Sequence, residues 1–163
     1  MPPALPRRKN LRMAGWDYQE AGIYFVTICA KDMQCLFGHI RAAIDKTAAM
    51  RLSPVGQAVH EAIDRINGIY GQVTVNRHVI MPNHPHMLLV LGDPSRAKQP
   101  TAPPLLRRVV GQMKRAVSAR LGFPVWKRSF HDHVVRDEDD LRFRLYMELN
   151  PSRWAEDRFC QPE

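Results

Sequence analysis

The sequence predicts an α+β fold in which helices pack on an antiparallel sheet, and two observations lead to this class. Segments rich in β-branched and aromatic residues, such as IYFVTICAK (23–31) and QVTVNRHVI (72–80), are typical of strands. In two other segments, 53–67 and 105–122, apolar residues recur at helical spacing. Because the strand segments come in pairs joined by short breaks, they are expected to pair antiparallel and to carry the helices.

Two hairpins are expected along the chain. The segment 23–31 is followed, after a short polar break, by LFGHI (36–40), and the two are predicted to form the first hairpin. The segment 72–80 leads through the turn MPNH into HMLLVL (86–91), which gives the second hairpin. A Pro-rich loop over 93–104 then separates the second hairpin from the next helix.

Two helices are predicted to be amphipathic. Ser53 is the expected N-cap of the first helix, and Pro54 its first residue. The apolar side of this helix consists of Val55, Val59, Ile63 and Ile66. The apolar stripe of the second consists of Leu106, Val109, Val110, Met113, Val117 and Leu121. Most basic residues of this helix lie off that stripe: Arg107, Arg108, Lys114, Arg115 and Arg120. They form either a solvated basic face or a surface that contacts phosphates.

The C-terminal part is predicted to be extended over 125–136 and then helical. Asp137 is the expected cap of this last helix, and Pro151 marks its end. One stripe of the helix, expected to pack inward, consists of Leu141, Leu145 and Leu149. A neighbouring polar stripe that could hold a phosphate consists of Arg142, Tyr146 and Asn150. On spacing alone, an ordinary amphipathic helix with a partly buried Tyr and an Asn near its C-terminal end is the preferred interpretation.

Size and charge narrow the class of protein. The 163 residues fit a basic flexible arm (1–15) and one domain (16–163). No apolar run reaches a membrane span of about 18 residues, and the first residues lack a signal-peptide core, so a cytoplasmic protein is expected. The 24 Lys and Arg against 16 Asp and Glu give a formal charge of +8. Such a charge attracts nucleic acid, although a basic protein without that partner would look the same.

His84 and His86 form a candidate metal pair. Side chains two apart in a strand project from the same face, so both imidazoles could point at one divalent ion. Pro85 between them lacks an N–H and is expected at a strand start or an edge. By itself a His-x-His pair is weak evidence for a metal, because histidines in strands are often solvent-facing or hydrogen-bonded.

Other residues compete for these roles. Tyr18, Tyr24 and Tyr70 have no ligand-type residue four positions along a helix, so structural or DNA-stacking roles are expected for them. His133, in the rival pair HDH at 131–133, is expected to contact DNA or to pack. Structural or surface roles are expected for His39, His60 and His78.

Four segments resemble the REP-associated tyrosine transposases, within the single-tyrosine HUH transposase superfamily. These segments occur in the family's order and span most of the chain: YFVTICAKDMQCLFG (24–38), VIMPNHPHMLLVL (79–91), VWKRSFHDHVVRDEDDLR (125–142) and YMELNPSRWAED (146–157). The resemblance implies a ferredoxin-like sheet. It also implies cleavage and rejoining of single-stranded DNA at REP-like hairpins, through a 5′-phosphotyrosine intermediate.

The resemblance assigns roles to individual residues. Tyr146 is the implied nucleophile, and His84, His86 and Asn150 are the implied ligands of a divalent metal, Mg²⁺ or Mn²⁺. The metal helps because a free tyrosine has a pKa near 10, so that phenolate costs about 4 kcal/mol at pH 7. The residues expected to contact DNA are Arg107, Arg108, Lys114, Arg115, Lys127, Arg128 and Arg142.

Two departures from the family pattern leave other functions open. Pro85 stands where relatives usually have an aliphatic residue and could turn one ligand away, and Lys127 stands where they often have Gln. One alternative is a hairpin-DNA-binding protein without catalytic activity, and another is a small His-ligated metal protein unrelated to DNA. The expected assembly is a monomer or a homodimer, associated with the nucleoid when bound to DNA.

Overall fold

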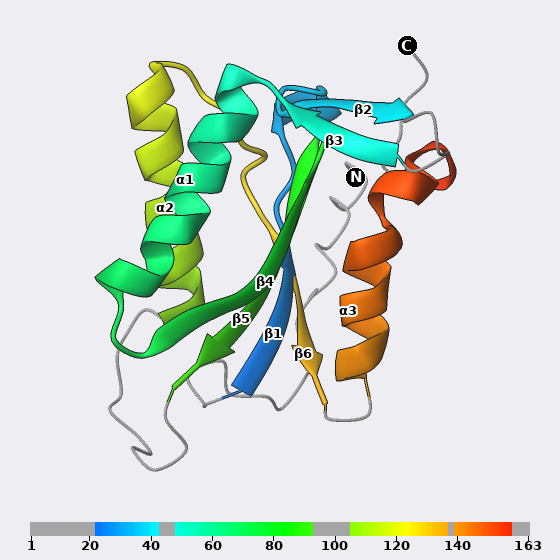
Figure 1. Cartoon of the computed structure of the whole chain (residues 1–163). Coiled ribbons are helices and arrows are strands. Elements are labelled where there is room, and N and C mark those ends of the chain that lie inside the picture. The colour runs from blue at the N-terminus through cyan, green and yellow to red at the C-terminus, as the bar shows by residue number, and fades with distance from the viewer. Residues whose placement is uncertain (1–21, 43–47, 93–104, 137–138, 158–163) are drawn as a thin grey trace, which may run out of the picture.

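A four-stranded antiparallel sheet with three helices packed against it forms the centre of the protein (Figure 1). The computed structural model describes residues 22–42, 48–92, 105–136 and 139–157. The α+β class is therefore confirmed, whereas the expected arm (1–15) and the Pro-rich loop (93–104) lie outside the described residues. None of the helices in these described ranges is long and apolar enough to cross a membrane.

The order of the sheet is that of a ferredoxin-like fold. The strands lie side by side in the order β4-β5-β1-β6, and every neighbouring pair is antiparallel. Along the chain the core elements are β1 (Gly22–Thr27), α1 (Pro54–Ile69), β4 (Val73–Met81), β5 (His84–Leu91), α2 (Leu105–Leu121) and β6 (His131–Val135). The β4–β5 hairpin matches the second predicted hairpin, and its two-residue turn consists of Pro82 and Asn83.

The first predicted hairpin is wrong. β1 pairs on its two edges with β5 and β6, so no edge remains for the segment that follows it. A short 3-10 turn, η1 (Lys31–Met33), redirects the chain, with Asp32 and Met33 at a φ of 55°. The next strand, β2 (Gly38–Ala42), pairs instead with β3 (Ala48–Leu52). β3 has an Ala-rich sequence, and Ala is depleted in strands, which is why its pattern does not predict it.

Helices α1 and α2 cover one face of the sheet and bury the larger core. The predicted apolar residues of α2 are buried there, with Leu121 partly buried at the end of the stripe. The strand side of this core includes Tyr24 and Val26 on β1, and Met87 and Leu89 on β5. The predicted cap of α1 is confirmed, because the Ser53 hydroxyl accepts from the Gly56 N–H at 3.0 Å.

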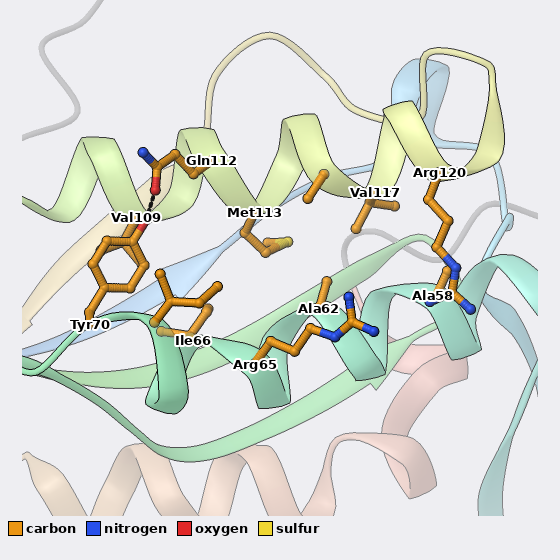
Figure 2. Close-up of a pocket in the computed structure, with 12 residues that line it drawn as sticks. Ala58, Ala62, Arg65, Ile66, Tyr70, Val109, Gln112, Met113, Val117 and Arg120 are labelled. Carbon is orange, nitrogen blue, oxygen red and sulfur yellow. Dashed lines mark hydrogen bonds between the residues drawn. The ribbon is translucent and has the colours of Figure 1, made fainter.

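A groove of about 400 Å³ lies between α1 and α2 (Figure 2). Its lining is mostly apolar, with small side chains such as Ala58 and Ala62. The Tyr70 hydroxyl donates to Gln112 at one end, and Arg120 lies at the other. None of the predicted catalytic or metal-binding residues lines this groove, so the candidate active site lies elsewhere in the molecule.

Helix α3 (Asp140–Leu149) lies on the opposite face of the sheet (Figure 1). It packs on a smaller apolar cluster through Met147 and Phe143. The predicted inward stripe of this helix is wrong, because its leucines are the exposed ones: Leu141 (67%), Leu145 (48%) and Leu149 (45%). Residues two apart on a helix differ by about 200°, so inward-facing Phe143 and Met147 force those leucines outward.

The end of α3 follows the prediction. Asn150 ends the helix, and Pro151 begins the 3-10 turn η2 (Pro151–Glu156). The expected cap, Asp137, lies outside the described residues, and Asp139 occupies the N-cap position without a side-chain cap bond.

We expect Ser53→Ala to lower the free energy of unfolding by about 1–2 kcal/mol. The Ser53 hydroxyl caps α1 and also donates to the Leu36 carbonyl at 2.6 Å, so the substitution removes two bonds at once. Urea denaturation of both proteins measures the difference. Ser129→Ala, at an exposed loop position, is the matched control and should change stability by less than about 0.5 kcal/mol; equal effects would contradict the capping role.

Candidate active site

The two predicted ligand histidines lie at the start of β5, beneath α3. His84 and His86 are both buried, at 0% and 2% exposure. Side chains alternate along β5, so Met87 and Leu89 enter the core under α1 and α2, whereas Leu88 joins the cluster under α3. The histidines share the face of Leu88. Their Nε2 atoms are 3.1 Å apart, so both imidazoles converge on one point.

Pro85 does not turn either histidine away. It is the second residue of β5 and therefore lies at the start of the strand, as its missing N–H requires. Its carbonyl accepts from the N–H of Ile28, the residue directly after β1, at 3.2 Å, which holds the strand in the sheet at this point. The geometry of the pair is thus compatible with proline between its members.

A chain of hydrogen bonds fixes the orientation of both imidazoles. The Asn83 amide nitrogen donates to the Met33 carbonyl at 3.2 Å, so its oxygen faces His84 Nδ1, 2.7 Å away. An amide oxygen only accepts, so Nδ1 carries the proton and Nε2 of neutral His84 has a lone pair. On the other side, His86 Nδ1 is 2.7 Å from the Thr27 hydroxyl. A hydroxyl can donate or accept, so this contact suits either tautomer of His86.

The donor atoms fit a divalent metal. Two nitrogens each about 2.0–2.1 Å from one ion lie about 3 Å apart, close to the separation of the two Nε2 atoms. The Asp157 carboxylate is also close, with Oδ2 3.9 Å from His84 Nε2 and a side chain only 3% exposed. Two imidazoles and a buried carboxylate are a typical ligand set for several divalent ions.

Asn150, the predicted third ligand, is also buried at this end of α3. It is 3% exposed, and its amide nitrogen has no hydrogen-bond partner among the described residues. The role of Asn150 as a ligand stays a prediction. Asp157 was not predicted as a ligand, although it closes the motif YMELNPSRWAED; its position after η2 brings it back to His84, which spacing along the chain does not reveal.

Tyr146 lies over the histidine pair. Its ring contacts His86 edge-on at a centroid distance of 5.5 Å, and Phe25 at 6.1 Å. The side chain is 45% exposed, so it is accessible from solvent on one side and contacts His86 on the other. Of the rival tyrosines in the described part of the chain, Tyr24 is buried on the other face of the sheet, and Tyr70 lines the distant groove.

A pocket of about 240 Å³ opens beside Tyr146. Its lining combines two guanidinium groups, an amide, a phenol and two apolar side chains: Arg142, Leu145, Tyr146, Leu149, Asn150 and Arg153. Arg142 was predicted as a phosphate contact, whereas Arg153 was not. Helical spacing does not indicate Arg153, because α3 ends at Leu149 and Arg153 lies in η2 with a non-helical backbone.

The structure separates the predicted DNA-contacting residues into groups. Arg142 lies at the pocket, and Lys127 and Arg128 are exposed near the end of β1, where the Lys127 N–H donates to the Cys29 carbonyl at 2.9 Å. The basic residues of α2 lie across the sheet from Tyr146; they are Arg107, Arg108, Lys114 and Arg115. A direct role of each in binding DNA stays a prediction.

Lys114 has a structural role as well. Its ammonium donates to the carbonyls of Lys127 and Arg128, at 2.7 and 3.3 Å, and thereby joins α2 to the segment before β6. Burial lowers the pKa of Lys114 from its usual value, with a smaller opposing effect of Cys29. The rival His133 contacts Phe143 at a centroid distance of 5.5 Å, and its predicted packing role agrees with that contact.

Comparison with solved structures identifies the class of fold. A REP-associated tyrosine transposase, solved bound to a REP hairpin, is 17% identical and superposes with a TM-score of 0.61 over 90% of this chain and 76% of that one. The fold is therefore that of the REP-associated tyrosine transposases, which confirms at the level of fold the resemblance in the sequence.

A comparison of sequences identifies a family member. An uncharacterized protein of Haemophilus influenzae is 30% identical over 172 residues, which cover 93% of this chain and 92% of that protein. The chain belongs to the same family as this Haemophilus influenzae protein. No protein-family model matches the chain.

We expect neutral, metal-free His84 to carry its proton on Nδ1, because the Asn83 amide oxygen accepts from that atom. Long-range ¹H–¹⁵N NMR of the imidazole nitrogens distinguishes the two tautomers. Asn83→Ala should mix the tautomers, whereas Asn76→Ala, at an exposed residue of β4, should leave the signals unchanged. A proton on Nε2 in the unsubstituted protein would contradict this assignment.

Proposed function

We propose that the protein is a metal-dependent tyrosine transposase, a single-strand DNA endonuclease that cleaves and rejoins DNA at REP-like hairpins. The observation that carries the proposal is the convergence of His84 Nε2 and His86 Nε2 beneath the ring of Tyr146. A nucleophile, a metal-binding pair and an anion-binding pocket thus occupy one face of the sheet. The fold shared with a REP-associated tyrosine transposase supports the same function.

In this proposal His84, His86 and Asp157 hold the divalent ion, and Asn150 is an alternative to Asp157. Such an ion, when bound, withdraws charge from the phosphate oxygens and so lowers the cost of attack at phosphorus. Thr27 and Asn83 keep the imidazoles in place. Residues of this kind behind metal ligands typically contribute tenfold to a hundredfold to metal affinity.

The chemistry of the proposed reaction is balanced without an external energy source. The Tyr146 hydroxyl loses its proton, its oxygen forms a bond to the scissile phosphorus, and the bond from phosphorus to the 3′ oxygen breaks. The 3′ oxygen takes up a proton, which leaves a free 3′-OH and a 5′-phosphotyrosine. Because the phosphodiester energy is conserved in the covalent link, a 3′-OH can reverse the step and rejoin DNA.

The pocket beside Tyr146 supplies a place for the DNA backbone. Arg142 and Arg153 can donate in pairs to phosphate oxygens, and Leu145 and Leu149 offer apolar contact to a base. In this proposal the exposed Lys127 and Arg128 contact the strand beyond the site. The arginines of α2 lie on the opposite side of the sheet, so in this proposal they contact a different part of the hairpin.

We expect Tyr146→Phe to abolish a covalent protein–DNA adduct, because phenylalanine has no nucleophilic oxygen. Incubation with an end-labelled hairpin oligonucleotide and Mg²⁺ or Mn²⁺, followed by denaturing electrophoresis, detects the adduct. Tyr70→Phe, at the distant groove, is the matched control and should retain it. An adduct that persists in Tyr146→Phe would exclude this residue as nucleophile, and hairpin binding without any adduct would favour the catalytically inactive alternative.

We expect His84→Ala to weaken Mn²⁺ binding at least tenfold, because it removes one of two converging nitrogens. Electron paramagnetic resonance of free Mn²⁺ measures the dissociation constant directly. Asp157→Asn and Asn150→Ala, compared side by side, assign the third ligand by the larger loss. Asn76→Ala should bind as the unsubstituted protein does, and unchanged affinity in His84→Ala would contradict the proposed metal centre.

A further inference from the structure

A second group of metal-ligating side chains lies on the other face of the sheet. His60 and Asp64 are four residues apart on α1 and therefore lie on one side of the helix, next to His78 on β4. His60 Nδ1 is 3.0 Å from His78 Nε2, and His60 Nε2 is 3.3 Å from Asp64 Oδ2. One ligand atom from each of the three residues falls within 4.8 Å of the others.

The contact between His60 and Asp64 has a clear direction. A carboxylate only accepts, so the proton of neutral His60 lies on Nε2, and Nδ1 presents a lone pair toward His78. Without an ion, His78 Nε2 donates its proton to that lone pair. With the His78 proton on Nδ1 instead, two imidazole lone pairs face one point at a separation suited to one ion.

We propose that His60, His78 and Asp64 form a second divalent metal site, specific for ions that bind imidazole, such as Zn²⁺. Two nitrogen ligands favour zinc over magnesium, which requires an oxygen-rich shell. Asp64 either binds the ion directly or accepts from His60 Nε2 as its carboxylate partner, an arrangement common among zinc-bound histidines. Neither His60 nor His78 takes part in the proposed cleavage of DNA.

The position of the site determines what the ion does there. It joins α1 to β4, two elements that also meet through apolar contacts of the larger core and through the hydrogen bond that the Val75 N–H donates to Asn67 Oδ1 at 2.6 Å. The side chains of His60 and Asp64 are 39% and 58% exposed, so solvent reaches the site and the ion exchanges. Bound zinc therefore acts as a reversible cross-link, and its stabilisation of the native state rises with the logarithm of the free zinc concentration once that concentration exceeds the dissociation constant.

Isothermal titration of the full chain with Zn²⁺ tests the proposal. His78→Ala should lower the zinc stoichiometry by one equivalent, whatever His84 and His86 bind, so that failure of the first site and failure of this one are distinguishable. His39→Ala, at an exposed histidine of β2, is the matched control and should keep the stoichiometry. Asp64→Ala, on the exposed side of α1, should keep the fold and weaken the second site about tenfold.

Thermal denaturation adds a second measurement. Excess Zn²⁺ should raise the Tm of the unsubstituted protein and of His39→Ala by more than it raises the Tm of His78→Ala. An equal number of zinc equivalents in the unsubstituted protein and His78→Ala would overturn the proposal. So would imidazole NMR signals of His60 and His78 that do not shift on addition of Zn²⁺.

Discussion

The register of β5 is the constraint on which the rest of the structure depends. The two-residue turn after β4 pairs Met81 with His84, and every later pair in the hairpin follows from it, apart from one irregularity near Val75. A slip by one residue would move His84 and His86 to the larger core and Met87 toward α3, because side chains alternate with a period of two. The same hydrogen bonds that close the turn therefore decide which face of the sheet carries the histidines. Ala30 and Phe37 donate to the turn carbonyls of Asn83 and Pro82, and so fix it from outside the hairpin.

Much of the fold could be predicted from local pattern. The helices α1 and α2, the Ser53 cap and the β4–β5 hairpin appear where periodicity and turn residues indicate them. Long-range choices could not be predicted in the same way. β1 pairs with β5 and β6, which are both distant in sequence, and not with the adjacent β2. The residues of β1 and β2 alone do not show that these distant strands are the preferred partners.

The leucines of α3 illustrate a second limit. Both stripes of the helix are apolar enough to face a sheet, and the one with Phe143 and Met147 is chosen because these side chains meet Phe25 and Leu88. That choice depends on the shape of the partner surface, which a helical wheel does not describe.

The principal residues of the candidate site could be predicted from the sequence, whereas the residues that orient and surround them could not. The paired histidines and Tyr146 belong to motifs, and the structure brings them together. Thr27 comes from β1, whereas Arg153 and Asp157 come from η2 and its end, so their place at the site follows from the register of β1 and from the path of η2. Asn83 could have been suspected from the sequence, since it directly precedes His84. Its role in orienting the imidazole, however, depends on a hydrogen bond to the carbonyl of Met33 in η1, which is distant in sequence.

The unequal size of the two cores has a consequence for how such a protein changes over time. Most of the buried apolar residues lie under α1 and α2, whereas the cluster under α3 is small. Substitutions beside Tyr146 therefore change only a small part of the free energy of unfolding, and the larger core still keeps the protein folded. Most residues that determine stability thus lie on one face of the sheet, and those that would determine target specificity lie on the other. The second face can therefore change to fit a new target while the first keeps the chain folded.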